Sequence, residues 1–210
     1  MTQGYGIDMN AIRSTLERIR ALLDMSLKVS DPRTEDWVIV SNVVDHAGRL
    51  HESAKDKIVI FLAGIQHETV ISTHNRTASI GNDKFGVIAP PLYINLLVVF
   101  FANFYDKNYG EGLAMIARTI GFFQQTPYFT RENMPDLDPA INKLTLEMVN
   151  LDLTQTNYLM GLMGTKYLPS VAYRIRMIPF RSDAISGVVA SVQGRGLNEE
   201  PLSASREADK

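Results

Sequence analysis

The chain has 210 residues, with 21 lysines and arginines against 23 aspartates and glutamates, a formal net charge of −2. This near balance argues against a protein that binds nucleic acid through bulk charge, because neutralising phosphates requires a clear cationic surplus. Cysteine is absent, which excludes thiolate-ligated zinc, iron–sulfur clusters, thiol catalysis and disulfides.

The first part of the chain predicts one helix followed by two strands. Apolar residues recur at helical spacing over residues 8–27, with Asp8 as the N-cap. Residues 37–44 and 57–69 are rich in β-branched side chains and predict strands. Gly64 inside the second strand predicts a bulge.

The middle of the chain predicts a loop and then a buried strand. Residues 73–84 contain the Asn, Gly, Asp and Thr of a mobile loop. Residues 92–104 are apolar on both faces, which predicts the central strand of a sheet. At about 13 residues this stretch is shorter than the roughly 20 that span a bilayer as a helix. The first ten residues have no cationic and apolar regions of a secretory signal, so export by the general route is not expected.

The next segment predicts a helix and a surface excursion. Asn108 and Glu111 have the spacing of a capping box, and the helix that they begin is expected to end near Pro127. Residues 127–139 hold three prolines and no hydrophobic period, which indicates a surface loop.

Two strands and a short helix follow. Residues 144–148 and 173–177 alternate between apolar and polar side chains, the pattern of half-buried strands. Asp152 with Gln155 predicts a second capping box, and Gly164 predicts the C-terminal end of that helix.

This order of elements favours the α+β class. We expect a single domain over residues 1–181, with a mixed or antiparallel sheet packed by helices. Residues 182–210 contain no aromatic residue and are rich in Gly, Ser, Ala and charges. They predict a flexible C-terminal tail, or an arm that orders on a partner.

One group of residues is a candidate for metal binding or acid–base catalysis. It consists of His46, His51 and His67, with Asp45, Glu52 and Glu68 beside them. The histidine spacing does not match a helical zinc motif, so exposed loop side chains are the favoured interpretation. Neither a phosphate-binding glycine loop nor a nucleophile elbow is present. We therefore expect no catalytic residue, cofactor or metal.

Charged residues on two predicted strands are candidates for contacts between subunits. Arg174 and Arg176 share one face of a strand, and Glu147 lies on the polar face of another. The pattern is typical of a surface ion pair worth at most about 1 kcal/mol. It also fits charges that set the register between neighbouring subunits.

Four further residues complete the predicted interface set. Tyr128 and Phe129 lie in the proline-rich segment and are candidate partner anchors, with core packing as the alternative. Lys166 and Tyr167 lie in the expected loop before Pro169.

Three segments together resemble a known family. They are PPLYINLLVVFFANF (90–104), GLAMIARTIGFFQQTPYF (112–129) and LDPAINKLTLEMVNLDLTQTNYLMGLMGTKYLPSVAYRIRMI (137–178). Their content and order resemble the tail terminator, or cap, family of phage-tail-like extracellular contractile injection systems. The resemblance covers most of residues 38–181.

The resemblance implies a tail-terminator-like fold and a structural protein that is not an enzyme. Family members form a hexameric ring on the baseplate-distal end of the inner tube, stop its polymerisation and engage the last sheath ring. The implied partners are other copies of the chain, the inner tube protein and the sheath protein, with no nucleic acid or membrane. Assembly is expected in the bacterial cytoplasm. Known members often carry a longer C-terminal part, whose function is not expected of a chain that stops at Lys210.

Two alternatives stay open at this point. One is a baseplate or sheath-side adaptor of the same machine, which would lie at the other end of the particle. The second comes from a different class, a hydrolase that depends on a metal or on His46, His51 and His67.

Overall fold

The structure is a computed structural model and describes residues 10–45, 47–49, 51–69, 76–81, 84–88, 92–180 and 185–190. The helices are α1 (Ala11–Ser30), η1 (Glu52–Ala54), η2 (Asp106–Asn108), α2 (Tyr109–Gln125) and α3 (Leu153–Met163). The strands are β1 (Val38–Val40), β2 (Lys57–His67), β3 (Arg76–Gly81), β4 (Lys84–Ile88), β5 (Leu92–Asn103), β6 (Tyr128–Phe129), β7 (Leu144–Val149), β8 (Ser170–Phe180) and β9 (Ile185–Ala190). Within these ranges, no helix combines the length and the apolarity that crossing a membrane requires.

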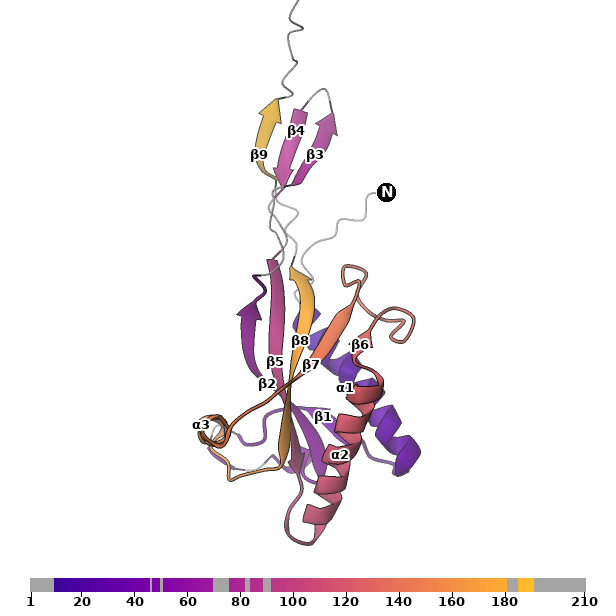
Figure 1. Ribbon diagram of the computed structural model, residues 1–210, viewed down its shortest axis with the longest axis vertical. Coiled ribbons are helices and arrows are strands. Elements are labelled where there is room, and N and C mark those ends of the chain that lie inside the picture. The colour runs from indigo at the N-terminus through magenta and orange to yellow at the C-terminus, as the bar shows by residue number, and fades with distance from the viewer. Residues whose placement is uncertain are drawn as a thin grey trace, which may run out of the picture.

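The main sheet has six strands in the order β1-β2-β5-β8-β7-β6 (Figure 1). β1 pairs with β2 in parallel, and the remaining pairs are antiparallel. The sheet is therefore mixed and is packed by helices, which confirms the predicted α+β class. β2 carries the expected bulge, since its register against β5 shifts between Leu62 and Gly64.

β5 is the central strand of the main sheet, as its sequence predicts. Phe100 and Phe101 point to opposite faces and both are fully buried. Complete burial of such a side chain stabilises the fold by about 1.5–3 kcal/mol. Both faces of β5 are therefore covered, and the strand cannot lie at a sheet edge.

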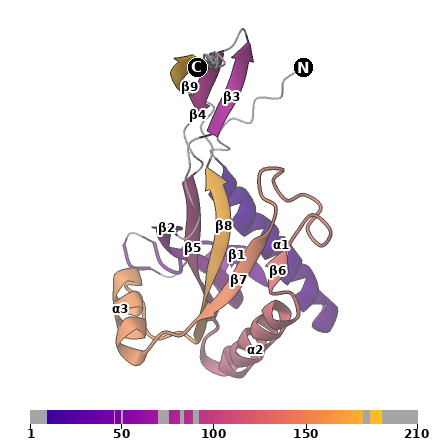
Figure 2. The same ribbon diagram turned by 45° about the horizontal axis from the view of Figure 1, so that its top comes forward.

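α1 and α2 cover one face of the main sheet. Leu16, Ile19 and Leu23 lie on one side of α1 and are buried in the core. From α2, Phe123 contacts Phe100 with 5.0 Å between ring centroids. Figure 2 shows α3 on the opposite side, at one end of the sheet, where Ala54 of η1 is also buried. The other face is thus only partly covered by a helix.

The two predicted capping boxes have different outcomes. In α3, the Asp152 side chain accepts a hydrogen bond from the backbone N–H of Gln155, and the Gln155 side chain accepts one from the backbone N–H of Asp152, so this box is confirmed. Gly164 ends the helix in the left-handed conformation, at φ +66°, also as predicted. In α2, Asn108 makes no side-chain cap hydrogen bond, so that prediction is wrong. Asn108 is the last residue of η2, and its nearly helical backbone lacks the extended conformation that capping requires.

The N-terminal elements differ in length from the sequence prediction. α1 begins at Ala11, and the predicted cap Asp8 lies outside the described residues. The strand expected over residues 37–44 is only β1, three residues long. Val43 is buried against α3 instead of extending the strand. Further on, the chain forms a turn in which the Asp45 carboxylate accepts hydrogen bonds from the backbone of Ala47 and Arg49.

A second sheet joins strands from two distant parts of the chain, in the order β3-β4-β9. The sequence predicted a loop over residues 73–84, but residues 76–81 form β3. It also predicted a flexible tail, or an arm that orders on a partner, over residues 182–210, but residues 185–190 form β9 and pair with β4 of the same chain. The two corrections have different causes. β9 pairs with a segment far away along the chain, whereas β3 pairs with its neighbour β4 and has the Thr, Ser and Gly that are typical of loops. The domain boundary at residue 181 remains a prediction.

Candidate assembly surface

The buried carboxylate of Glu68 lies where three strands of the main sheet meet. Arg176 of β8 donates to Glu68 Oε2 from Nη2 at 2.7 Å and from Nε at 3.0 Å. Asn95 of β5 donates to the same oxygen from Nδ2 at 3.0 Å. Glu68 is only 4% exposed. Among the described residues, the Arg176 guanidinium and the Asn95 amide thus support its charge.

Arg176 also binds a second carboxylate. Its Nη1 donates to Glu147 Oε1 of β7 at 3.0 Å. The hydrogen bonds that Arg176 donates to Glu68 and, to a smaller extent, to Glu147 raise the pKa of Arg176 above its ordinary value. Arg176 faces Thr145 in the β7–β8 register, so the ion pair with Glu147 runs diagonally across the two strands.

Arg174 is in a different situation from Arg176. It lies directly opposite Glu147 in the β7–β8 register. Arg174 is half-buried and makes no ion pair with any residue in the described part of the chain. Of the two predicted arginines, Arg174 is therefore the one that remains available to a neighbouring subunit. That role is still a prediction.

The two predicted aromatic anchors have opposite environments. Phe129 is 1% exposed and packs against Phe122, with 6.4 Å between ring centroids. It lies in the core, the alternative that its sequence context allowed, and presents no surface to a partner in this structure. Tyr128 is exposed, and the ammonium group of Lys143 lies 4.2 Å from its ring centroid.

α3 has an apolar surface that the interface prediction did not include. Leu153 and Leu162 are 87% and 86% exposed, and Tyr158 is also exposed. Only Met160 and Met163 of this helix are buried. A helix that is apolar on all sides is typical of a buried position. The sequence LTQTNYLMGLM carries this signal, because its apolar residues do not form a single stripe.

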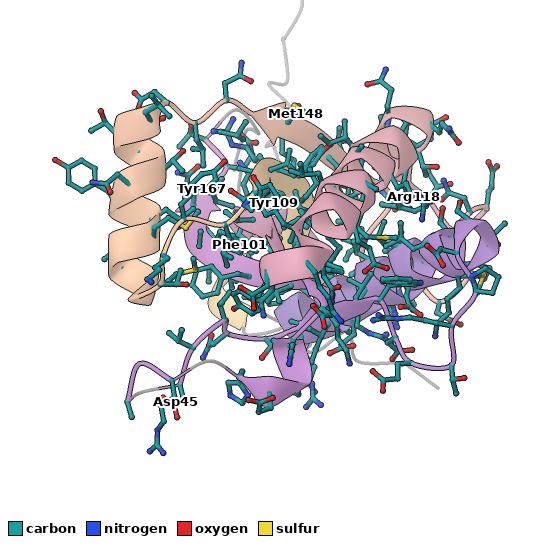
Figure 3. The ribbon with its side chains drawn as sticks, turned by 90° about the horizontal axis from the view of Figure 1, so that it is seen from below. Asp45, Phe101, Tyr109, Arg118, Met148 and Tyr167 are labelled. Atoms are coloured by element: carbon teal, nitrogen blue, oxygen red, sulfur yellow. The ribbon has the colours of Figure 1, made fainter. Side chains whose placement is uncertain are left out.

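The loop after α3 extends this surface. Lys166 and Tyr167 are both exposed, as their predicted contact role requires. Tyr167 and Tyr109 line one groove of about 520 Å³ (Figure 3). A second groove of about 570 Å³ lies between residues 42–45 and the end of α3, and it adjoins the first at Gly164. We call the exposed side chains of α3, this loop and the two grooves the α3 surface.

The acidic and histidine residues of the predicted catalytic group contact residues outside that group or lie outside the described residues. Glu68 binds Arg176 and Asp45 closes a turn. His51 lies 3.5 Å from the hydroxyl of Ser53, and His46 falls outside the described residues. Among the residues that the structure describes, no three His, Cys, Asp or Glu side chains come together as metal ligands.

With this geometry established, the chain was compared with known proteins. The model of the Pvc16 N-terminal domain family matches residues 14–193. The chain belongs to this family. The match covers most of the sequence and confirms the resemblance to the tail terminator, or cap, family. No curated protein matches this chain.

Two solved structures have a similar fold. One is the PVC sheath/tube terminator of an extracellular contractile injection system in its extended state, with a TM-score of 0.56 and 10% identity. That alignment covers 93% of this chain and 64% of the other. The second is the tube-terminating cap of the anti-feeding prophage, with a TM-score of 0.50 and 12% identity over 84% of this chain and 58% of the other. The chain therefore spans roughly three fifths of the length of these proteins.

Proposed function

We propose that this chain is the structural cap, or tail terminator, subunit of a contractile injection system. Family membership and the fold shared with two solved terminators support this role. In this role the protein catalyses no reaction and needs neither cofactor nor metal. Its partners are further copies of itself, the inner tube protein and the sheath protein. Assembly takes place in the bacterial cytoplasm, and the finished cap is part of a phage-tail-like particle.

The proposed cap is a homo-hexameric ring at the baseplate-distal end of the inner tube. There it stops tube polymerisation and engages the last sheath ring. A subunit that ends a stack of rings needs one face that fits the tube and another that cannot template a further ring. The main sheet supports such asymmetry, because α1 and α2 cover one face whereas α3 covers only one end of the other (Figure 2).

The α3 surface is the observation that carries the proposed ring. Leu153, Tyr158 and Leu162 are exposed on a helix whose composition is typical of a buried one. Grooves lie beside the same helix. A contact between two different surfaces of the chain joins copies head to tail. Such contacts close into a ring when the rotation from one copy to the next divides a full turn evenly. Lys166 and Tyr167 belong to the same contact, with Tyr128, Glu147 and Arg174 as further proposed contacts.

Measuring the mass of the purified protein tests the ring. Six copies of a 23.5 kDa chain have a mass of about 141 kDa. Light scattering is expected to find this mass for the protein alone or mixed with tube subunits. A mass of one chain in both samples would contradict the proposal. Deleting the protein from a particle-producing strain is expected to give tubes of uncontrolled length in negative stain.

Two further measurements separate the cap from its alternatives. Labelled protein is expected at the end of the particle away from the baseplate, and a label at the baseplate would favour an adaptor. Metal analysis of protein without a histidine tag is expected to find no stoichiometric ion. Replacing His46, His51 and His67 with alanine together is expected to leave ring mass unchanged. A bound metal that this triple variant loses would favour a hydrolase.

A further inference from the structure

The three strands of the second sheet repeat the order of the three central strands of the main sheet. β3 follows β2 along the chain, β4 precedes β5, and β9 follows β8. The main sheet contains the order β2-β5-β8 and the second sheet has the order β3-β4-β9. Figure 1 shows the second sheet beyond the ends of β5 and β8, on the side away from α2 and α3. We call β3, β4 and β9 the distal sheet.

The distal sheet has two open edges within the described part of the chain. β4 pairs with β3 on one side and with β9 on the other, and no further described strand joins them. Figures 1 and 2 show no helix over either face. A small sheet of this kind needs a packed face or additional strands to be stable. The distal sheet is therefore incomplete as a single copy.

The edge strands of the two sheets differ in length and in charge. This difference indicates that the edges of the distal sheet pair with strands of another chain. The main sheet ends in β1 with three residues and β6 with two, and strands this short offer little backbone to another chain. β9 instead has six residues, ISGVVA, with neither a charge nor a proline. β3 also has six residues, and its one charged residue is Arg76 at the first position. Natural proteins protect exposed edges with charges, prolines or short strands, and β9 has none of these.

The strand directions fit pairing of these edges with further copies of the same chain. β3 and β9 are both antiparallel to β4, so they run in the same direction on opposite edges. Rotation about an axis along the strands preserves that direction. The β9 edge of one copy therefore meets the β3 edge of the next copy as a parallel pair, and every copy uses both edges once.

We propose that β9 of each subunit pairs with β3 of its neighbour, so that the distal sheets form one continuous sheet around the ring. This inference rests on the proposed ring and identifies its second contact. With three strands from each copy, six copies form an eighteen-stranded barrel. Barrels of 16–18 strands enclose an aqueous channel, which gives the ring a central opening.

Disulfide cross-linking tests the proposed pairing sharply, because the chain has no cysteine of its own. In one copy β4 separates β3 from β9, so their Cα atoms are about 9–10 Å apart at the nearest. A disulfide requires Cα atoms within about 7 Å. A bond between cysteines in β3 and β9 must therefore join two copies. Ala78→Cys is combined in turn with Ser186→Cys, Val188→Cys and Ala190→Cys, so that three registers between copies are tested.

At least one of these double variants is expected to form a ladder of covalent oligomers up to six chains after mild oxidation, with loss of most of the monomer band. The matched control combines Ala78→Cys with a cysteine at the exposed residue Glu132 and is expected to give no such ladder. Single-cysteine variants are expected to give dimers at most. Light scattering of each reduced sample shows whether the ring is present.

The outcomes separate this inference from the proposed function. A ring of normal mass with no cross-link in any register would overturn the β9–β3 pairing and leave the cap proposal standing. A mass of one chain, with and without tube subunits, would overturn the ring itself. Cross-links that appear only after sheath protein is added to cysteine variants of both proteins would assign the edges to a sheath strand, against the proposed partner.

Discussion

Arg176 and Glu68 are 108 residues apart in the sequence and 2.7 Å apart between Nη2 and Oε2. Glu68 is buried, whereas the Arg176 side chain is 31% exposed. The pair therefore has an inner carboxylate that depends on an outer guanidinium. Arg176 joins β8 to the end of β2 and, through Glu147, to β7. Its contacts lie within one subunit, so its first role is to stabilise the sheet.

Replacing Arg176 with methionine is expected to destabilise the fold by about 3 kcal/mol, because it removes a guanidinium that binds the buried Glu68 carboxylate directly. Urea unfolding at neutral pH measures the loss. The double variant with Glu68→Gln is expected to recover part of that stability, since the buried charge is then gone. Equal stability of the single variant and the unchanged protein would show that Glu68 does not depend on Arg176.

The neighbouring arginine is expected to behave differently. Arg174→Glu is predicted to impair ring closure. It is also expected to lower the unfolding midpoint modestly, because it places a second carboxylate directly opposite Glu147. Light scattering gives the ring mass and urea unfolding gives the stability. A ring of unchanged mass would place Arg174 in solvent.

A charge introduced on α3 tests the α3 surface. Leu162→Glu is expected to abolish the ring with little effect on stability, because the side chain is 86% exposed in one subunit. Val29→Glu on α1 is the matched control, since Val29 is 82% exposed on the helix pair at the other face. Loss of the ring in both variants, or in neither, would argue against a specific contact through α3.

Two glycines of α2 allow a matched test of packing. A Cβ atom at Gly112 would lie 2.9 Å from Cβ of Phe104, so Gly112→Ala forces a shift of buried atoms and is expected to cost about 1–3 kcal/mol. A Cβ atom at Gly121 meets nothing within 4 Å. Gly121→Ala is therefore expected to stabilise the helix by up to about 1 kcal/mol. Thermal unfolding of the two variants should show shifts of opposite sign.

Acid unfolding is expected to depend in part on Asp36. The hydrogen bond from Lys28 lowers the pKa of Asp36 below its ordinary value of 3.8, with 2.6 Å between Lys28 Nζ and Asp36 Oδ1. A carboxylate with a lowered folded-state pKa stabilises the protein above its unfolded pKa, and this contribution is lost as the pH falls through the folded value. Asp36→Asn should therefore lower the urea midpoint near pH 7, and the difference should shrink below about pH 4. A difference that stays constant to pH 2 would assign the effect to packing.

Local patterns in the sequence were enough to predict much of the fold. β5 is apolar on both faces, and that pattern alone predicted a central strand. The end of α3 at Gly164 and its capping box at Asp152 also follow from neighbouring residues. These features are predictable because helix and strand periods, caps and glycine conformations depend on only a few adjacent positions.

The predicted interface residues show where local patterns stop being informative. Tyr128 and Phe129 are adjacent in the sequence, yet one is exposed and the other lies in the core. Arg174 and Arg176 occupy equivalent positions in the strand pattern, but only Arg176 meets a buried carboxylate. Strand alternation separates the two faces of a sheet, whereas the neighbours on each face come from other parts of the chain.

The sequence by itself determined the α+β class, the central strand, the start and end of α3 and, through its three familiar segments, the family. The tertiary structure alone decided that β9 pairs with β4, that Glu68 binds Arg176, and that the apolar helix α3 is left exposed. The physical reason is distance along the chain. Each of these features depends on segments that meet only after folding, and neither partner carries a local signal of the other.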